Sequence, residues 1–199
     1  MASRRNLKLL ILGFALWVSS PILAQNDTPL TTSEKAVTRF ERMIDPLTLL
    51  YSAAGAGIGQ WRDEPPEWRQ GAGGFGRRFA ASEGWKITQN SVALGFDKAF
   101  GLDPRFHPST ETRFWPRLGS AMAQTLVAYK DSGGRAFNYS QVCGSYGASL
   151  ISNSWFPSHS NGVGDALERG TIGLGLNTAS NVAKEFWPDI RRTVFRRGR

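Results

Sequence analysis

The stretch from Ala136 to Gly164 contains no Lys, Arg, Asp or Glu over 29 consecutive residues. It is not strongly apolar either, because Gly, Ala and Ser alternate in it with large side chains such as Leu150 and Trp155. A solvated helix carries polar and charged residues on its outer face, and a membrane-spanning helix is more apolar than this stretch. The composition therefore predicts a helix that neighbouring helices hold closely.

The first residues are typical of a secretion signal. Basic residues precede an apolar run from Leu9 to Val18, and a plausible cleavage position follows Ala24. The alternative is an uncleaved N-terminal anchor, but the run is shorter than the ~20 apolar residues that a membrane span needs. We therefore expect a signal peptide over residues 1–24 and an exported bacterial protein, located in the periplasm or at the periphery of the outer membrane.

The exported part is long enough for one domain with a sizeable core. We expect a polar leader and a short helix over residues 25–45, a helical domain over 46–190 and a basic tail over 191–199. Apolar residues recur at helical spacing, whereas period-2 alternation is short and Val, Ile and Thr do not cluster. The prediction is an all-α protein, a compact bundle of about six glycine-notched helices.

Capping and turn residues predict where several of these helices begin and end. A short helix ends at Met43. The next segments form two helices, a glycine-loosened one over Trp68–Ala81 and a second over Ser82–Phe100. A further helix spans Arg117–Lys130, and the last one ends at Phe186.

The positive charge is concentrated at the two ends of the chain. The formal net charge is +8, yet residues 25–190 hold 16 basic and 16 acidic side chains. Basic residues near an anionic membrane contribute roughly 1 kcal/mol each, so we expect the tail to contact such a surface. A frayed, solubilising terminus is the alternative, and nucleic acid is not an expected partner of an exported chain. The tail arginines are Arg191, Arg192, Arg196, Arg197 and Arg199.

Pairs of small residues four positions apart recur in five segments. Residues at this spacing share one face of a helix, so each pair leaves a notch that a second backbone can approach. Glycine in a helix costs up to ~1 kcal/mol relative to alanine, and close packing at the notches would offset that cost. The pairs are Gly55 and Gly59, Gly76 and Ala80, Gly119 and Ala123, Gly144 and Ala148, and Gly175 and Ala179.

Two turns in the middle of the chain hold the polar residues best suited to chemistry. Asp103 and His107 are a candidate acid–base pair, with Asp131 as a further candidate. The candidates for holding a phosphate or carboxylate are Arg105, Lys130 and Arg135. The alternative is that Asp103 caps a turn and the arginines pair with nearby acids. A shared site requires the two turns to converge in one pocket.

The sequence gives no sign of a metal or cofactor site. His107 and His159 are the only histidines, and they are too far apart in the chain to form a local zinc motif. Cys143 is the only cysteine, so no intramolecular disulfide can form, and its small neighbours favour a buried position over a nucleophilic one. We therefore expect no metal and no cofactor.

Four segments carry a family resemblance. The L-D-P-R-F segment at 102–106 and the D-S-G-G-R-x-F-N-Y-S segment at 131–140, together with Ile151–Asn153 and Glu185–Ile190, resemble those of uncharacterised exported bacterial proteins. The resemblance covers roughly residues 46–195 and implies no activity.

Two functions follow from these observations. The first is a non-enzymatic helical protein of the cell envelope, in contact with the membrane. The alternative is a hydrolase, or a protein that binds a lipid headgroup or phosphate through the loops at 102–107 and 130–135.

Overall fold

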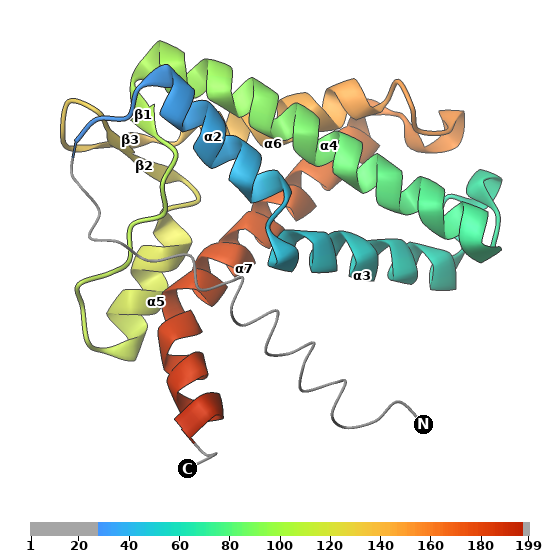
Figure 1. Cartoon of the computed structure of the whole chain (residues 1–199). Coiled ribbons are helices and arrows are strands. Elements are labelled where there is room, and N and C mark those ends of the chain that lie inside the picture. The colour runs from blue at the N-terminus through green and yellow to red at the C-terminus, as the bar shows by residue number, and fades with distance from the viewer. Residues whose placement is uncertain (1–27, 197–199) are drawn as a thin grey trace.

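The computed structural model describes residues 28–196, which are mostly helical and include a small antiparallel sheet (Figure 1). The predicted all-α class is confirmed. The predicted signal peptide lies outside the described residues, as do Arg197 and Arg199. The helices are α2 (Thr32–Met43), α3 (Pro46–Arg62), η1 (Pro66–Trp68), α4 (Gly71–Phe100), α5 (Phe114–Ala123), α6 (Tyr139–Ser152), η2 (Ser158–Ser160) and α7 (Val163–Arg196), and the strands are β1 (Leu102–Asp103), β2 (Val127–Lys130) and β3 (Arg135–Phe137).

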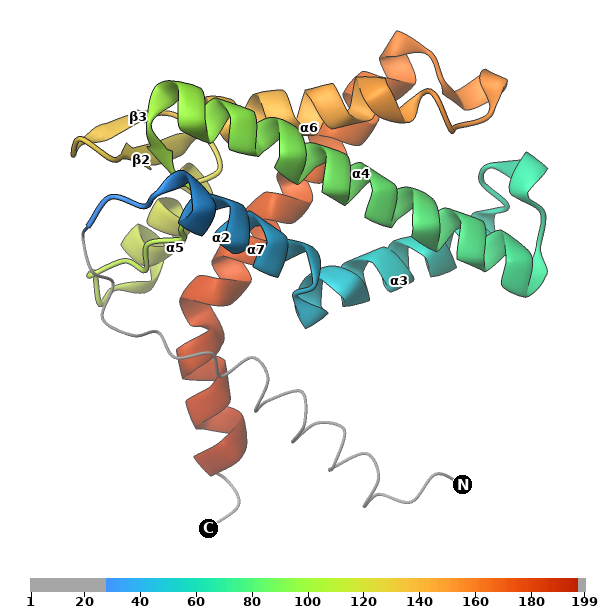
Figure 2. The same ribbon diagram turned by 45° about the horizontal axis from the view of Figure 1, so that its top comes forward.

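The long helix α4 organises the bundle. It packs against α6 along one side and against α2 and α3 along the other. Helix α7 packs against α6 and α5, and Figure 2 shows it running from α6 past α2 and α5 towards the C-terminus. No helix in residues 28–196 is long and apolar enough to cross a membrane.

Helix α6 occupies the middle of the uncharged stretch and is held between α4 and α7. A Cβ atom at Gly144 would lie 3.0 Å from the carbonyl oxygen of Gln89 and 3.1 Å from Cβ of Ala93, so any larger residue would require the two helices to shift slightly apart. Ala148, one turn further on, is fully buried. The small pair in α6 therefore lies at a close contact between two helices, as its spacing predicts.

Most of the other small pairs do not pack against a helix, and those predictions are wrong. The spacing of small residues identifies a smooth helix face, but it does not indicate whether another helix packs against that face. Gly59 lies against the carbonyl oxygen of Glu64 and the side chain of Arg78, which belong to the turn after α3 and to α4. The remaining members are exposed: Gly55, Gly76, Ala80, Gly119, Ala123, Gly175 and Ala179.

Two glycines of α7 make a matched test of this distinction. A Cβ atom at Gly173 would lie 2.4 Å from Cη2 of Trp85, whereas one at Gly175 would have nothing within 4 Å. We expect Gly173→Ala to lower the free energy of unfolding by about 1–3 kcal/mol through overpacking. Gly175→Ala should raise it by up to ~1 kcal/mol through helix propensity. Urea unfolding measures both, and equal shifts in the two variants would contradict this packing.

The predicted break between Ala81 and Ser82 is wrong, because α4 continues without interruption. Arg78 is 4 % exposed and holds the N-terminal part of α4 on the preceding turn. Its guanidinium donates to Oε1 of Gln60 and to three backbone carbonyls, those of Glu64, Pro65 and Arg69. These charge-assisted bonds anchor a glycine-rich segment that is a weak helix former by itself.

Two other predicted boundaries are also wrong. The segment predicted as one helix over Arg117–Lys130 divides, since α5 ends at Ala123 and β2 pairs with both β1 and β3. Helix α7 does not end at Phe186 but continues through Pro188 to Arg196. The first residues of the predicted basic tail therefore belong to the last helix.

Candidate binding cavity

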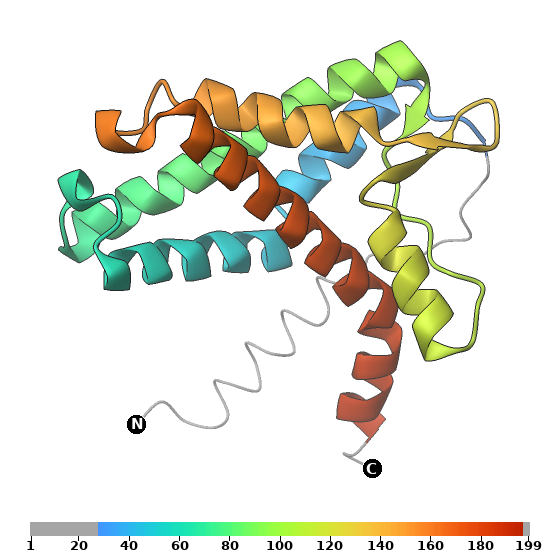
Figure 3. The same ribbon diagram turned by 180° about the vertical axis from the view of Figure 1, so that it is seen from behind.

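A cavity of about 360 Å³ lies among α2, α3, α4, α7 and the loop after β1. Figure 3 shows α7 crossing in front of α4 and α2, with the end of α3 beside it, and α7 supplies one wall. Helix α4 supplies another wall, and α3 contributes small and hydroxyl residues. The cavity thus joins segments that are far apart in the sequence, and short-range pattern cannot reveal it.

The wall formed by α7 changes in polarity along the helix. Its lining residues recur every three or four positions, so they share one face. In chain order they are Arg169, Ile172, Gly173, Leu176, Asn177, Ser180, Asn181 and Lys184. The face therefore begins at the guanidinium of Arg169, is apolar from Ile172 to Leu176, carries amides and a hydroxyl further on, and ends at an ammonium group.

The described residues that line the cavity include six basic residues and one acidic residue, Asp103. Three of the basic residues have carboxylate partners. Arg39 pairs with Asp97 at 2.8 Å, Lys86 with Glu83 at 2.8 Å, and Arg105 with Asp103 at 2.6 Å. The other three, for which the described residues provide no ion pair within 4.0 Å, are Arg42, Arg169 and Lys184.

Arg42 and Lys184 form the least compensated part of the cavity. Arg42 donates a hydrogen bond to the carbonyl oxygen of Pro104, and Nζ of Lys184 has no hydrogen-bond partner among the described residues. Burial, with repulsion from Arg42, lowers the pKa of Lys184 to about 8, although Asp45 opposes this shift. Burial, with repulsion from Arg39, lowers the pKa of Arg42 to about 10, although Asp97, Asp103 and Asp45 oppose this shift. Two like charges thus share a partly dehydrated space.

A second polar group of the lining lacks a partner. Gln141, in the first turn of α6, is 7 % exposed, and its Nε2 atom makes no hydrogen bond. The neighbouring amide of Gln89 is satisfied, because its Nε2 donates to Oγ of Ser145 at 2.9 Å. An unmade hydrogen bond of a buried amide costs about 1–3 kcal/mol. Gln141 therefore offers a donor to a molecule in the cavity.

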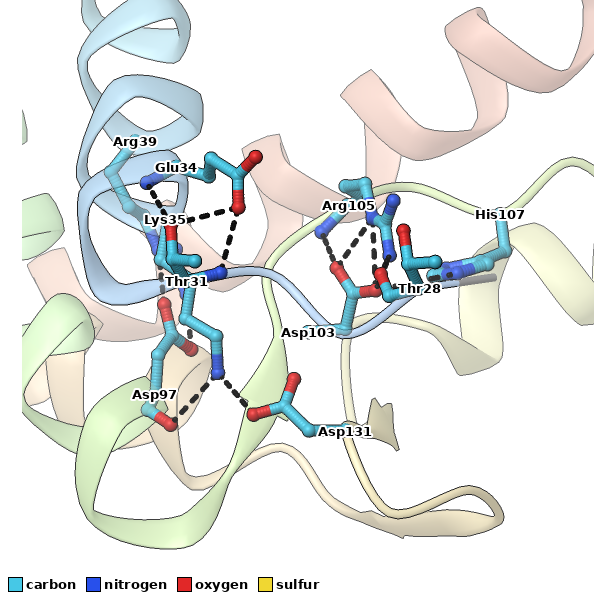
Figure 4. A network of polar contacts seen from close by, with 10 residues as sticks. All are labelled: Thr28, Thr31, Glu34, Lys35, Arg39, Asp97, Asp103, Arg105, His107 and Asp131. Carbon is cyan, nitrogen blue, oxygen red and sulfur yellow. Dashed lines mark hydrogen bonds and ion pairs between the residues drawn. The ribbon is translucent and has the colours of Figure 1, made fainter. Parts of the chain in front are cut away.

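Figure 4 shows the ion pairs that attach α2 to the rest of the protein. The guanidinium of Arg39 donates two parallel hydrogen bonds to the carboxylate of Asp97, at 2.8 and 2.9 Å. Lys35, one turn earlier in α2, pairs with Asp131 at 2.5 Å. Asp131 is therefore a structural partner of α2.

The predicted acid–base pair Asp103 and His107 is close, with Nε2 of His107 3.8 Å from the nearer carboxylate oxygen. Both oxygens of Asp103, however, accept hydrogen bonds from Arg105. Burial by itself would raise the pKa of Asp103, but these bonds from the side chain and backbone of Arg105 outweigh it and lower the pKa. Asp103 is thus a weak base that orients Arg105. His107 stacks on Tyr129, with their ring centroids 4.2 Å apart.

The predicted anion ligands do not meet in one pocket. β1 and β2 are paired, so the two predicted turns are adjacent in space. Arg105 lines the cavity, but Lys130 is exposed and Arg135 lies over the ring of Tyr129, 5.3 Å from its centroid. The prediction of one anion-binding site formed by Arg105, Lys130 and Arg135 is therefore wrong.

The described lining of the cavity is rich in hydrogen-bond donors. No histidine or cysteine is among its described lining residues. Within residues 28–196 there is also no cluster of three potential metal-ligating side chains. Amide, hydroxyl and cationic donors dominate instead, and such donors recognise phosphate or carboxylate groups.

Sequence reasoning missed Arg42, Gln141 and Lys184. Their signal is weak but present in α7, where Asn177, Asn181 and Lys184 recur on one face of a helix that is rich in glycine and apolar residues. Polar residues at helical spacing on a face that should be buried indicate a cavity with a polar lining. The partners on α2 and α6 have no local signal, because the fold alone brings them together.

Comparison of the chain with models of known protein families, with curated proteins and with solved structures finds no match.

Proposed function

We propose that this protein is a non-enzymatic, exported binding protein that holds the anionic group of a small molecule in its central cavity. The observation that carries the proposal is the unpaired ammonium of Lys184 beside the guanidinium of Arg42. A bound phosphate or carboxylate would supply the missing negative charge and accept charge-assisted hydrogen bonds from both. The export signal expected from the N-terminal sequence supports a place in the cell envelope.

A matched pair of lysine and arginine variants tests this proposal. Lys184→Met keeps most of the side-chain volume and removes the charge from the cavity. Arg192→Met removes one charge from an exposed position of the same helix. With inorganic phosphate as the probe, we expect calorimetry to show binding to the parent protein and to Arg192→Met. Lys184→Met should bind about tenfold or more weakly, the equivalent of one hydrogen bond to a charged group.

The proposal fails if the parent protein binds no phosphate, or if the two variants bind it equally well. In either case the positive charge inside the cavity would have no part in ligand binding, and its cost in the fold would need another explanation.

The hydrolase alternative has less support. It requires an activated nucleophile or a free base near the bound ligand. Asp103 is engaged by Arg105, Asp131 is engaged by Lys35, and His107 is not among the residues that line the cavity.

We also propose that the C-terminal arginines contact an anionic membrane surface. The exposed positions of Arg191 and Arg192 near the end of α7 support this proposal. In a flotation assay we expect the full exported chain to bind vesicles that contain phosphatidylglycerol and to leave them at high salt, because screening weakens surface electrostatics. Equal binding to phosphatidylcholine vesicles would contradict it.

A further inference from the structure

We infer that the ligand of the central cavity is an anionic lipid with a single acyl chain, in which a polar linker separates the anionic head from the chain. This inference rests on the proposed binding function and specifies its ligand class. It follows from the order in which apolar, amide and cationic side chains succeed one another along α7 and across the facing walls.

The cationic end fixes the head group. Lys184 and Arg42 line it together, and Arg105 approaches from the loop after β1. Phosphate and carboxylate are the groups that such a set of donors binds. A cationic head would add a third unpaired positive charge to this space. Repulsion from Lys184 and Arg42 therefore excludes it.

The middle of the cavity matches a polar linker. Asn177, Ser180 and Asn181 lie between the cationic and apolar ends of the α7 face, and Gln141 lines the cavity with a buried donor that has no partner. At a rise of about 1.5 Å per residue, the eight helical steps from Leu176 to Lys184 span roughly 12 Å. The side-chain amides of Asn177 and Asn181 already donate to Gly173 and Thr125. A head joined directly to an alkyl chain would place methylene groups in this region and leave Nε2 of Gln141 unsatisfied.

The apolar end matches an acyl chain. Trp85 and Phe156 line the cavity together with Ile172 and Leu176. The guanidinium of Arg169 borders this end, where it lies over the ring of Phe156, 4.3 Å from its centroid, and donates to the carbonyl oxygen of Ser160. Ile172 is 55 % exposed and Leu176 is 47 % exposed, so these two line the cavity and also reach solvent. Gly55 lines the same cavity from α3 without a side chain and leaves room there. A chain that enters here covers apolar surface which water now contacts.

Three probes separate the parts of the ligand: glycerol 3-phosphate, 1-lauroylglycerol 3-phosphate below its critical micelle concentration, and 1-lauroylglycerol. Calorimetry on the parent protein should show the acylated phosphate binding at least a hundredfold more tightly than glycerol 3-phosphate. Affinity should rise by about fourfold for each methylene that becomes buried in a series of chain lengths. The uncharged 1-lauroylglycerol should bind at least tenfold more weakly than its phosphate.

A pair of leucine variants locates the chain. Leu176→Asn and Leu167→Asn replace leucines of α7 that are 47 % and 49 % exposed, and only Leu176 lines the cavity. We expect Leu176→Asn to weaken binding of the acylated phosphate at least fivefold without changing the affinity for glycerol 3-phosphate. Leu167→Asn should change neither affinity.

The outcomes distinguish this inference from the proposed function beneath it. If glycerol 3-phosphate binds as tightly as its lauroyl ester, the cavity binds a free phosphate ester and the lipid inference is wrong. Equal losses in the two leucine variants would also overturn it. If neither phosphate binds, both the inference and the proposed function are wrong. The chain-length series uses the parent protein, so the test does not depend on the folding of a variant.

Discussion

Arg39→Met and Asp97→Asn are each expected to lower the free energy of unfolding by about 3–5 kcal/mol. The side chains of this pair are 6 % and 1 % exposed, and two parallel hydrogen bonds join them. Removal of either partner leaves the other charge buried without compensation. The resulting loss of stability is much larger than the change expected when both residues are replaced by apolar ones. For a chain of this length the melting temperature should fall by on the order of 10 °C.

Two comparisons make this prediction specific. The double variant Arg39→Met, Asp97→Leu removes both charges and should be more stable than either single variant. Arg62→Met breaks an ion pair whose side chains are 62 % and 66 % exposed, and it should change stability by less than about 1 kcal/mol. Chemical denaturation of the four variants measures these differences. If Arg39→Met is as mild as Arg62→Met, the pair is not a buried anchor of α2.

Lys184→Met should raise the stability of the ligand-free protein at pH 7, by at most about 3 kcal/mol. The pKa of Lys184 falls from 10.5 to about 8 in the folded protein, so the folded state disfavours the ammonium form. Below pH 8 the lysine is protonated in both states and its full cost is present. Between about pH 8 and 10.5 the unfolded chain binds more protons, so the stability of the parent rises with pH relative to the variant.

Unfolding free energies of the parent and Lys184→Met at several pH values from 7 to 10 measure this effect. The difference between the two proteins should be largest near pH 7 and should shrink as the pH rises. Arg192→Met is the control, because its exposed charge should give a difference that does not change over this window. A constant difference between parent and Lys184→Met would contradict a depressed lysine pKa in the folded state.

The helical class could be predicted from the sequence because it depends on local pattern. The uncharged stretch around Gly144 predicted a tightly held helix, and α6 is one. Small-residue spacing was less informative, since a Cβ atom added to Gly55 or Gly175 would have no neighbour within 4 Å. Such spacing shows that a helix face is smooth enough for close packing. A contact also requires a second helix next to that part of the face.

The candidate site was harder to predict because it depends on long-range contacts. Asp103 was predicted as an acid–base residue and Arg105 as an anion ligand, but in the structure their charges largely satisfy each other. The uncompensated charge belongs to Arg42 and Lys184, which are 142 residues apart in the chain and meet only after α2 has packed on α4 and α7 on α6. The only local signal is the place of Lys184 on one helix face with Asn177 and Asn181, and no local pattern distinguishes Arg42 from an ordinary surface cation.

The titration of Lys184 with and without an anion tests the central claim most directly. The chain has six lysines, so ¹³C NMR of their Cε groups, with Lys184→Met for assignment, can follow each one. We predict a midpoint for Lys184 near pH 8 in anion-free buffer and a higher midpoint when phosphate is present. A midpoint near 10.5 that phosphate leaves unchanged would show that this lysine is an ordinary solvated cation, and the cavity would lose its role as an anion site.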